Sequence, residues 1–204
     1  MRWINLLLLP AALATSIGDA KADSVVVMSG EANLVVADQA SSSHSTIEVE
    51  QIGIVNAVTV YQQGLNNNAS FRSVGDSQNH IADQRGGSNL LAVESTGPDN
   101  ASDIVQIAAS GGQNAMLLLQ NGANNQAIME QDATGAGLSS ITLTQSGNDN
   151  SAHLVQTGTD NMIALAQNGD ANSATITQSG SGHSINLVQG GGGQVVIAQS
   201  NSGG

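Results

Sequence analysis

Residues 145–180 read QSGNDNSAHLVQTGTDNMIALAQNGDANSATITQSG, in which Gln-x-Gly-x-x-Asn or a close variant returns every eleven residues. The same spacing continues, with a few short insertions, from Met28 to Gln199. When the unit that ends at Met28 is numbered zero, all of the insertions follow odd-numbered units. We therefore expect successive units to alternate between two sides of a stack, so that a pair of units forms the structural repeat.

Each unit alternates between two sets of positions. In residues 150–156, NSAHLVQ, the first set is Asn150, Ala152, Leu154 and Gln156. From residue 33 onward no Asp, Glu, Lys or Arg occupies this first set in any unit, whereas the second set holds carboxylates and an arginine. A period of two with the charges on one side predicts β-strands that have one buried and one solvent-exposed face. A helix would need apolar residues three and four apart, which the units lack.

Two strands and two four-residue turns make a rung of 22 residues. Rungs that stack about 4.8 Å apart build two parallel sheets that face each other across a thin core. Glycine at the second turn position, as at Gly147, supplies backbone angles that residues with a Cβ resist. The predicted fold is therefore all-β, a two-sheet parallel β-solenoid of about eight 22-residue rungs, roughly 40 Å tall at that spacing.

The Gln and Asn side chains at the inner ends of each strand need hydrogen-bond partners. A buried amide without a partner costs about 1–3 kcal/mol. An amide that lies directly above an identical amide can donate to its carbonyl, so we expect ladders of stacked side chains that also fix the strand register. The predicted ladder and turn residues are Gln51, Gly53, Asn56, Gln62, Gly64, Asn67, Gln120, Gly122, Asn125, Gln131, Ser139, Gln145, Gly147, Asn150, Gln156, Gly158, Asn161, Gln167, Gly169, Asn172, Gln178, Gly180 and Gln189.

The composition favours a regular stacked core over an irregular globular one. The 204 residues include 24 glycines, no cysteine and only 1% aromatic residues. A chain with so few aromatic residues is poorly suited to filling an irregular globular core, which usually depends on large side chains. The lack of cysteine excludes a disulfide framework, a thiolate metal site and a cysteine nucleophile.

The amino terminus has the pattern of a processing signal. Arg2 precedes a short apolar run, and Ala20 and Ala22 provide the small-x-small pattern that a signal peptidase reads. The apolar run is too short for a membrane-spanning helix, which needs about 20 residues. The sequence therefore predicts a signal peptide over residues 1–22, a mature chain that starts at Asp23, and a secreted protein.

The predicted mature chain is strongly acidic. Removal of residues 1–22 takes away two basic residues and one carboxylate, which changes the formal charge from −12 to −13. Arg72 and Arg85 are then the only arginines or lysines against fifteen carboxylates. Two arginines cannot build the basic patch that a nucleic acid or an anionic membrane requires, so we expect no nucleic-acid partner.

No constellation of side chains predicts catalysis. Asp149, Asp160 and Asp170 form the best acidic cluster, but each follows a turn glycine, and we interpret them as solvated turn residues with weak calcium binding as the alternative. The four histidines have no carboxylate or serine at a fitting repeat offset. We predict that the protein is not an enzyme, with no catalytic residue, no metal site, no cofactor and no small-molecule substrate.

The repeat resembles that of the curlins, the subunits of bacterial curli, which follow Ser-x5-Gln-x-Gly-x2-Asn-x-Ala-x3-Gln. The residues that match this pattern spacing for spacing are Ser139, Gln145, Gly147, Asn150, Ala152 and Gln156. The resemblance covers about residues 45–189, with degenerate copies at 67–84 and 89–106. It is specific because several positions at fixed spacing recur in tandem.

The resemblance implies a secreted structural subunit that polymerises outside the cell into curli-like amyloid fibres, a pilus that serves the biofilm matrix and cell adhesion. It implies a homopolymer, a nucleating or major curlin as partner, and export through the outer-membrane curli channel. The chain could be either the major fibre subunit or the minor, nucleating one. A monomeric secreted β-solenoid adhesin is the alternative.

The repeat pattern runs almost to the carboxyl terminus. Residues 184–189 and 195–199 keep the pattern, whereas natural solenoids usually end in polar caps. We expect open hydrogen-bonding edges that another subunit can extend. The predicted organisation is a signal peptide (1–22), an N-terminal segment with degenerate repeats (23–44), a curlin-like repeat solenoid (45–199) and a C-terminal tail (200–204).

The outward carboxylates are expected to slow premature assembly by mutual repulsion. Neutralising them should therefore shorten the lag before fibre growth, measured by thioflavin T fluorescence. An unchanged lag would show that these charges do not control assembly. The carboxylates concerned are Glu48, Glu50, Asp83, Glu94, Asp103 and Glu130.

Overall fold

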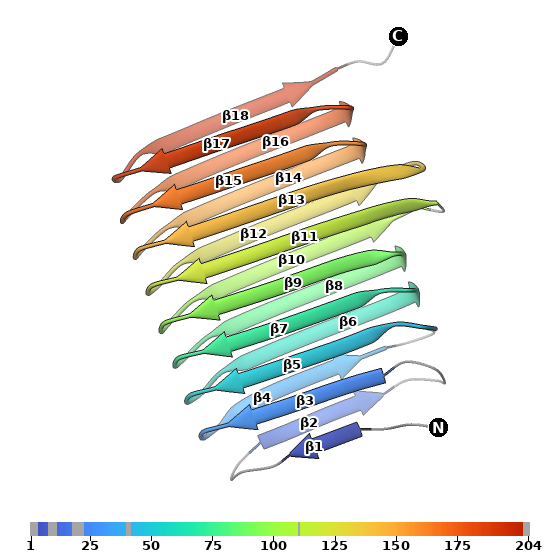
Figure 1. The fold of residues 1–204 in the computed structure, drawn as a ribbon, viewed down its shortest axis with the longest axis vertical. Coiled ribbons are helices and arrows are strands. Elements are labelled where there is room, and N and C mark those ends of the chain that lie inside the picture. Colours follow the sequence, from blue (N-terminus) through green and yellow to red (C-terminus); the bar gives the residue numbers. More distant parts are fainter. Residues whose placement is uncertain (1–3, 8–11, 18–22, 40–41, 110, 202–204) are drawn as a thin grey trace.

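The computed structural model describes residues 4–7, 12–17, 23–39, 42–109 and 111–201. These residues form two nine-stranded parallel sheets that lie face to face, with the two chain termini at opposite ends of the stack (Figure 1). Odd-numbered strands make sheet A, namely β1 (Ile4–Leu7), β3 (Asp23–Ser29), β5 (Thr46–Ile52), β7 (Asn68–Val74), β9 (Asn89–Thr96), β11 (Gly112–Asn121), β13 (Gly137–Ser146), β15 (Met162–Asn168) and β17 (Ser184–Gly190). Even-numbered strands make sheet B, namely β2 (Ala12–Ile17), β4 (Asn33–Asp38), β6 (Ala57–Leu65), β8 (Asn79–Gly87), β10 (Ala101–Ala108), β12 (Gln126–Ala133), β14 (Ser151–Thr159), β16 (Ser173–Ser181) and β18 (Gln194–Ser200).

Each strand pairs with the strand two positions along the chain, so one rung contributes one strand to each sheet. In sheet A, for example, Gln145 pairs with Gln167, and Gln167 pairs with Gln189, a spacing of one rung at each step. The predicted two-sheet parallel β-solenoid of about eight rungs, from β3 and β4 to β17 and β18, is confirmed.

The core is the thin layer between the two sheets. Leu143 and Ile163 from sheet A, and Leu154 and Ile176 from sheet B, are each at most 1% exposed. Within each strand, the residues immediately before and after a core residue point outward, because successive side chains of a strand alternate between its two faces. Burial of one alternating set therefore accounts for the period of two in the sequence.

The turns explain why glycine recurs beside the ladder residues. Gly147 has a φ of +116°, a left-handed value that favours glycine. A Cβ at this position would collide with the backbone carbonyl of Gly169, one rung further along the stack. The close stacking of identical turns, as well as the turn conformation, therefore requires glycine.

The insertions lie at one edge of the solenoid, as the sequence predicts. They fall between β4 and β5, between β10 and β11 and between β12 and β13, where the chain passes from sheet B to sheet A. Additional residues at these points lengthen a turn without disturbing the pairing on either side.

Strands β1 and β2 extend the stack at its amino-terminal end. β1 pairs with β3, and β2 pairs with β4, both in parallel. Both strands belong to the predicted signal peptide, which stays a prediction; its cleavage residues Ala20 and Ala22 lie outside the described residues. The open edges of the first rung can accept apolar strands in this way because their backbone groups need partners.

Residues 23–44, predicted as an N-terminal segment with degenerate repeats, supply β3 and β4. Val26 and Met28 of β3 and Val35 of β4 are 4% exposed or less. They form a rung continuous with those that follow. No helix among the described residues is long and apolar enough to cross a membrane.

Candidate functional site: the amide columns and the open ends

Glutamine side chains form one buried column in each sheet, at the ends of the strands. We call these the Gln columns. In sheet B, Gln62 donates from Nε2 to Oε1 of Gln84 at 2.8 Å, and Gln84 donates to Gln106 at 2.8 Å. The remaining side-chain bonds of the two columns join Gln39 to Gln62, Gln131 to Gln156, Gln156 to Gln178, and Gln178 to Gln199 in sheet B, and Gln120 to Gln145, Gln145 to Gln167, and Gln167 to Gln189 in sheet A.

Most of these amides also donate to the backbone of the opposite sheet. Gln156 of sheet B donates to the carbonyl of Ser140 in sheet A at 3.2 Å, and Gln167 of sheet A donates to the carbonyl of Ser151 in sheet B at 3.0 Å. Each such amide links its own rung to the next rung and one sheet to the other. Where the amides are paired in this way, they avoid the desolvation cost of buried polar groups.

Asparagine side chains form the matching columns at the starts of the strands. Nδ2 of Asn172 donates to Oδ1 of Asn150 at 2.9 Å, and Asn150 donates to Asn125 at 3.0 Å. At the other edge, Nδ2 of Asn161 donates to the turn carbonyl of Gly180 at 2.8 Å. The Asn columns thus satisfy backbone groups that the turns would otherwise bury without partners.

The sheet A column is interrupted in the degenerate repeats. Ser73 and Ser95 stand where glutamine is expected, and neither hydroxyl has a hydrogen-bond partner. Gln51 lies at its predicted place in the column and is buried, but its amide makes no hydrogen bond because its neighbours are Met28 and Ser73. The serines of the degenerate repeats could have predicted this gap from the sequence. The lack of a partner for Gln51 also depends on Met28, its neighbour on the other side.

The sheet B column has a gap that the sequence does not signal by a missing glutamine. Gln106 and Gln131 pair in register across β10 and β12. Their side chains form no hydrogen bond with each other, since Oε1 of Gln131 has no partner and Gln106 donates to the carbonyl of Leu90. The gap coincides with the three-residue insertion after Gln106, but such an insertion does not by itself interrupt the column, since Gln131 donates to Gln156 across the second one.

His80 is the one titratable side chain in the described core whose pKa is strongly shifted. Burial lowers the pKa of His80 from 6.5 to about 4. Its Nδ1 lies 2.9 Å from Oγ of Ser102, and its Nε2 lies 3.2 Å from Oε1 of Gln78. Ser102 pairs with His80 one rung away, so the expectation that no serine stands at a fitting repeat offset from a histidine is wrong. The ring also lies 6.3 Å, centroid to centroid, from that of Phe71. These contacts are those of a neutral packed histidine and offer no path to a substrate.

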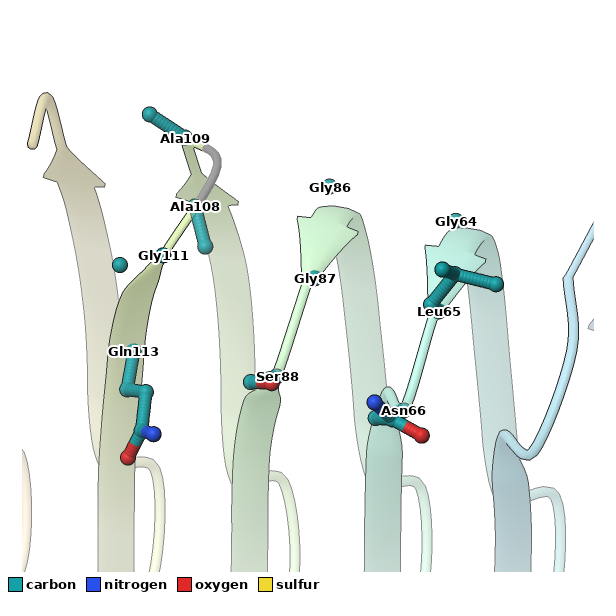
Figure 2. Close-up of a pocket in the computed structure, with 11 residues that line it drawn as sticks. Gly64, Leu65, Asn66, Gly86, Gly87, Ser88, Ala108, Ala109, Gly111 and Gln113 are labelled. Atoms are coloured by element: carbon teal, nitrogen blue, oxygen red, sulfur yellow. The ribbon is translucent and has the colours of Figure 1, made fainter. Parts of the chain in front are cut away.

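One surface hollow runs along the turn edge over residues 64–66, 86–88, 108–109 and 111–113 (Figure 2). None of the residues that line it is charged, and much of its wall is glycine. The described residues contain no group of three or more His, Cys, Asp or Glu that could hold a metal ion.

The carboxyl-terminal rung is open. β17 and β18 each have a neighbouring strand on one side only within the described residues. The inward side chains of Leu187 and Ile197 are only partly buried, whereas Leu165 and Ile176 in the previous rung are 2% exposed or less. The end of the stack therefore presents unpaired backbone groups together with a half-covered apolar core.

These features define a class, that of repetitive β-solenoids whose core is ordered by amide ladders. Within that class, the chain carries curlin repeats: the model of the curlin associated repeat matches residues 139–167 and 158–191. The two matches include the best-formed part of the Gln and Asn columns. No curated protein sequence matches the chain. Curlin repeats on a solenoid are typical of a structural subunit rather than of an enzyme.

Proposed function

We propose that the mature chain is secreted and polymerises end to end into an extracellular curli-like amyloid fibre. The single observation that carries this proposal is the open carboxyl-terminal rung, whose core positions and sheet B ladder position match those of the first rung, whereas Met28 takes the ladder position in sheet A. Exposed strand edges recruit further strands through backbone hydrogen bonds. Identical stacked side chains are also the arrangement that stabilises amyloid.

The positions that would meet across such a join follow from the register within the solenoid. If β18 of one copy lies on β4 of the next, Gln199 stacks on Gln39 and Ile197 on Ala37, because each pair occupies one column. In each side-chain bond of the Gln columns the earlier rung donates to the later one, as Gln178 does to Gln199. Nε2 of Gln199 is therefore the donor that would continue the column into the next copy.

The same stacking joins β17 to β3 in sheet A. Leu187 then lies over Val26, and both belong to the core. The edges of β3 and β4 are covered by β1 and β2 in the full chain, so this join requires that residues 1–22 be removed. Signal-peptide cleavage would therefore prepare the amino-terminal end for assembly.

The wider roles proposed are those of the curlin family. Fibres of this kind would serve the biofilm matrix and cell adhesion, with a nucleating or major curlin as a second partner and an outer-membrane curli channel as the route of export. The match to the curlin associated repeat supports these proposals.

The proposal is tested by diluting residues 23–204 from denaturant, with and without sheared preformed fibres. We expect a lag, growth of thioflavin T fluorescence, acceleration by seeds, and thin fibres in electron micrographs. A soluble monomer with β-type circular dichroism, no fibres and no response to seeds would contradict self-assembly and favour the monomeric adhesin. Adding a separate nucleating curlin to that monomer would then show whether the chain needs a partner to start.

A further inference from the structure

The outer face of sheet A changes character halfway along the solenoid. One outward column contains Glu50, Arg72 and Glu94, and Arg72 lies 3.1 Å from a carboxylate oxygen of each glutamate. The same column continues through Leu119, Thr144, Ala166 and Val188. The charged positions thus end at β9, and uncharged ones follow.

We call the outward-facing residues of β11, β13, β15 and β17 the neutral patch. These four strands contain no Asp, Glu, Lys or Arg, and the charged residues after residue 132 are three aspartates in turns. The patch includes exposed apolar side chains, with Met162 43% exposed and Val188 70% exposed. On sheet B the carboxylates extend one strand further, to Asp132 on β12, so its uncharged outer face is limited to the three strands β14, β16 and β18.

We infer that the neutral patch is the surface through which two filaments of this chain associate side by side, patch against patch. This inference rests on the proposed function, since it concerns the filament. The argument for a second copy is electrostatic: the mature chain carries a formal charge of −13, so most of its surface repels another copy. On sheet A only the neutral patch permits close approach without placing carboxylates opposite carboxylates.

The side chains of the patch suit sheet-on-sheet contact. Thr142, Thr144, Ala164 and Ala166 are short and occupy adjacent positions on β13 and β15. Two flat faces of short side chains can approach to about 10 Å and interdigitate, as sheets do in a steric zipper.

The size of the patch determines when the contact forms. Four strands about 4.8 Å apart, each presenting about seven residues at 3.3 Å, cover roughly 440 Å². A stable complex usually buries about 800 Å² on each partner, so isolated subunits should pair only weakly, at about millimolar concentration. In a filament the patch recurs once per subunit, and many weak contacts act together. Stable lateral association is therefore expected of filaments, and only weak pairing of monomers.

The acidic segments between successive patches should oppose this association. Salt at about 0.15 M screens charges beyond roughly 8 Å, so bundling should increase with ionic strength. Arg72 offsets only part of the negative charge on β5 and β9.

The test compares two matched substitutions, Ala164→Glu in the patch and Ala92→Glu on β9. Both alanines are half-buried, face outward and lie in one column of sheet A, separated by Leu117 and Thr142. Electron microscopy and turbidity measure how many filaments lie side by side, and thioflavin T with seeds measures polymerisation separately.

We expect both variants to form filaments at the wild-type rate, with A92E filaments bundled and A164E filaments at least fivefold less so. Bundling retained in both variants would overturn the inference, and so would loss of bundling in both. If the wild-type chain forms no filament, the proposed function fails, and sedimentation at millimolar concentration still tests the patch. Weak self-association removed by A164E and kept by A92E would support it, whereas no self-association would overturn it.

Discussion

Glutamines that look alike in the repeat have different surroundings in the columns. Gln145 accepts from Gln120 and donates both to Gln167 and to the backbone carbonyl of Gln126. Gln51 occupies an equivalent buried position, and neither its amide nitrogen nor its amide oxygen has a partner. The stability contributed by a column residue therefore depends on the residues directly above and below it.

The substitution Gln145→Leu should destabilise the monomer by about 2–4 kcal/mol, because it leaves buried donors and acceptors unpaired. The matched substitution Gln51→Leu should leave stability unchanged or raise it by about 1 kcal/mol, since it removes an amide that is already unpaired. Urea unfolding followed by circular dichroism measures both. Equal losses in the two variants would contradict the importance of ladder continuity.

His80 provides a pH dependence whose sign follows from its burial. The pKa is about 4 in the folded chain and 6.5 in the unfolded chain. Above pH 6.5 the ring is neutral in both states, and its contribution to stability is complete. As the pH falls from 6.5 toward 4, the unfolded chain takes up a proton that the folded chain does not, and up to about 3 kcal/mol is lost.

The double variant His80→Ala with Ser102→Ala should remove this part of the pH dependence without leaving the serine hydroxyl unpaired. The urea midpoint at pH 7.5 and pH 4.5 is the measurement, and the midpoint should fall further for the wild type than for the variant. The carboxylates titrate in both proteins, so they cancel in the comparison. A difference of zero would mean that His80 is accessible to protons in the folded chain.

At the scale of single elements, the turn between two strands limits how closely rungs can stack. Gly147 and Gly182 both have positive φ, at +116° and +70°. A Cβ on Gly147 would collide with the Gly169 carbonyl, whereas a Cβ on Gly182 would have nothing within 4 Å. The turn at Gly147 is therefore constrained both by its own backbone conformation and by the turn of the next rung. The turn at Gly182 is constrained only by its own backbone conformation.

The substitution Gly182→Ala should therefore cost about 1 kcal/mol, the usual cost of a left-handed alanine. Gly147→Ala should cost at least twice as much, because the neighbouring rung must also move. Thermal unfolding of the two variants tests this difference. Similar melting temperatures would indicate that the stacked turns can separate locally without cost.

At the scale of the whole molecule, growth depends on the open end. Ile197 and Val196 are adjacent on β18 and face opposite ways, with Ile197 toward the core and Val196 72% exposed on the outer face. A carboxylate at the inward position would be buried by the next copy without a partner, whereas one at the outward position would stay in water.

Ile197→Asp should reduce seeded elongation at least tenfold while the monomer still folds, because the side chain is only partly buried before assembly. Val196→Asp, with the same change of charge, should elongate within about twofold of wild type. Seeded thioflavin T growth rates measure both, with circular dichroism as the check on folding. Equal growth of the two variants would contradict end-to-end stacking through β18.

The strands, the rung of 22 residues, the buried set of side chains and the edge that contains the insertions can all be predicted from the repeat pattern. Each of these depends on local periodicity, since alternation along a strand and glycine in a turn act within one repeat. The positions of Gln145, Gly147 and Asn150 in the predicted columns and turns follow from the same periodicity.

The repeat pattern does not predict which members of a column are hydrogen-bonded or which outer faces are uncharged, because both depend on contacts between rungs. Gln51 has no partner, and Gln106 and Gln131 do not bond, because each such contact depends on residues one rung away. The pairing of β1 and β2 onto the first rung likewise depends on open edges that no local pattern describes. The neutral patch becomes visible once stacking brings residues 22 or more positions apart side by side, since a solenoid makes neighbours of residues that are distant in sequence.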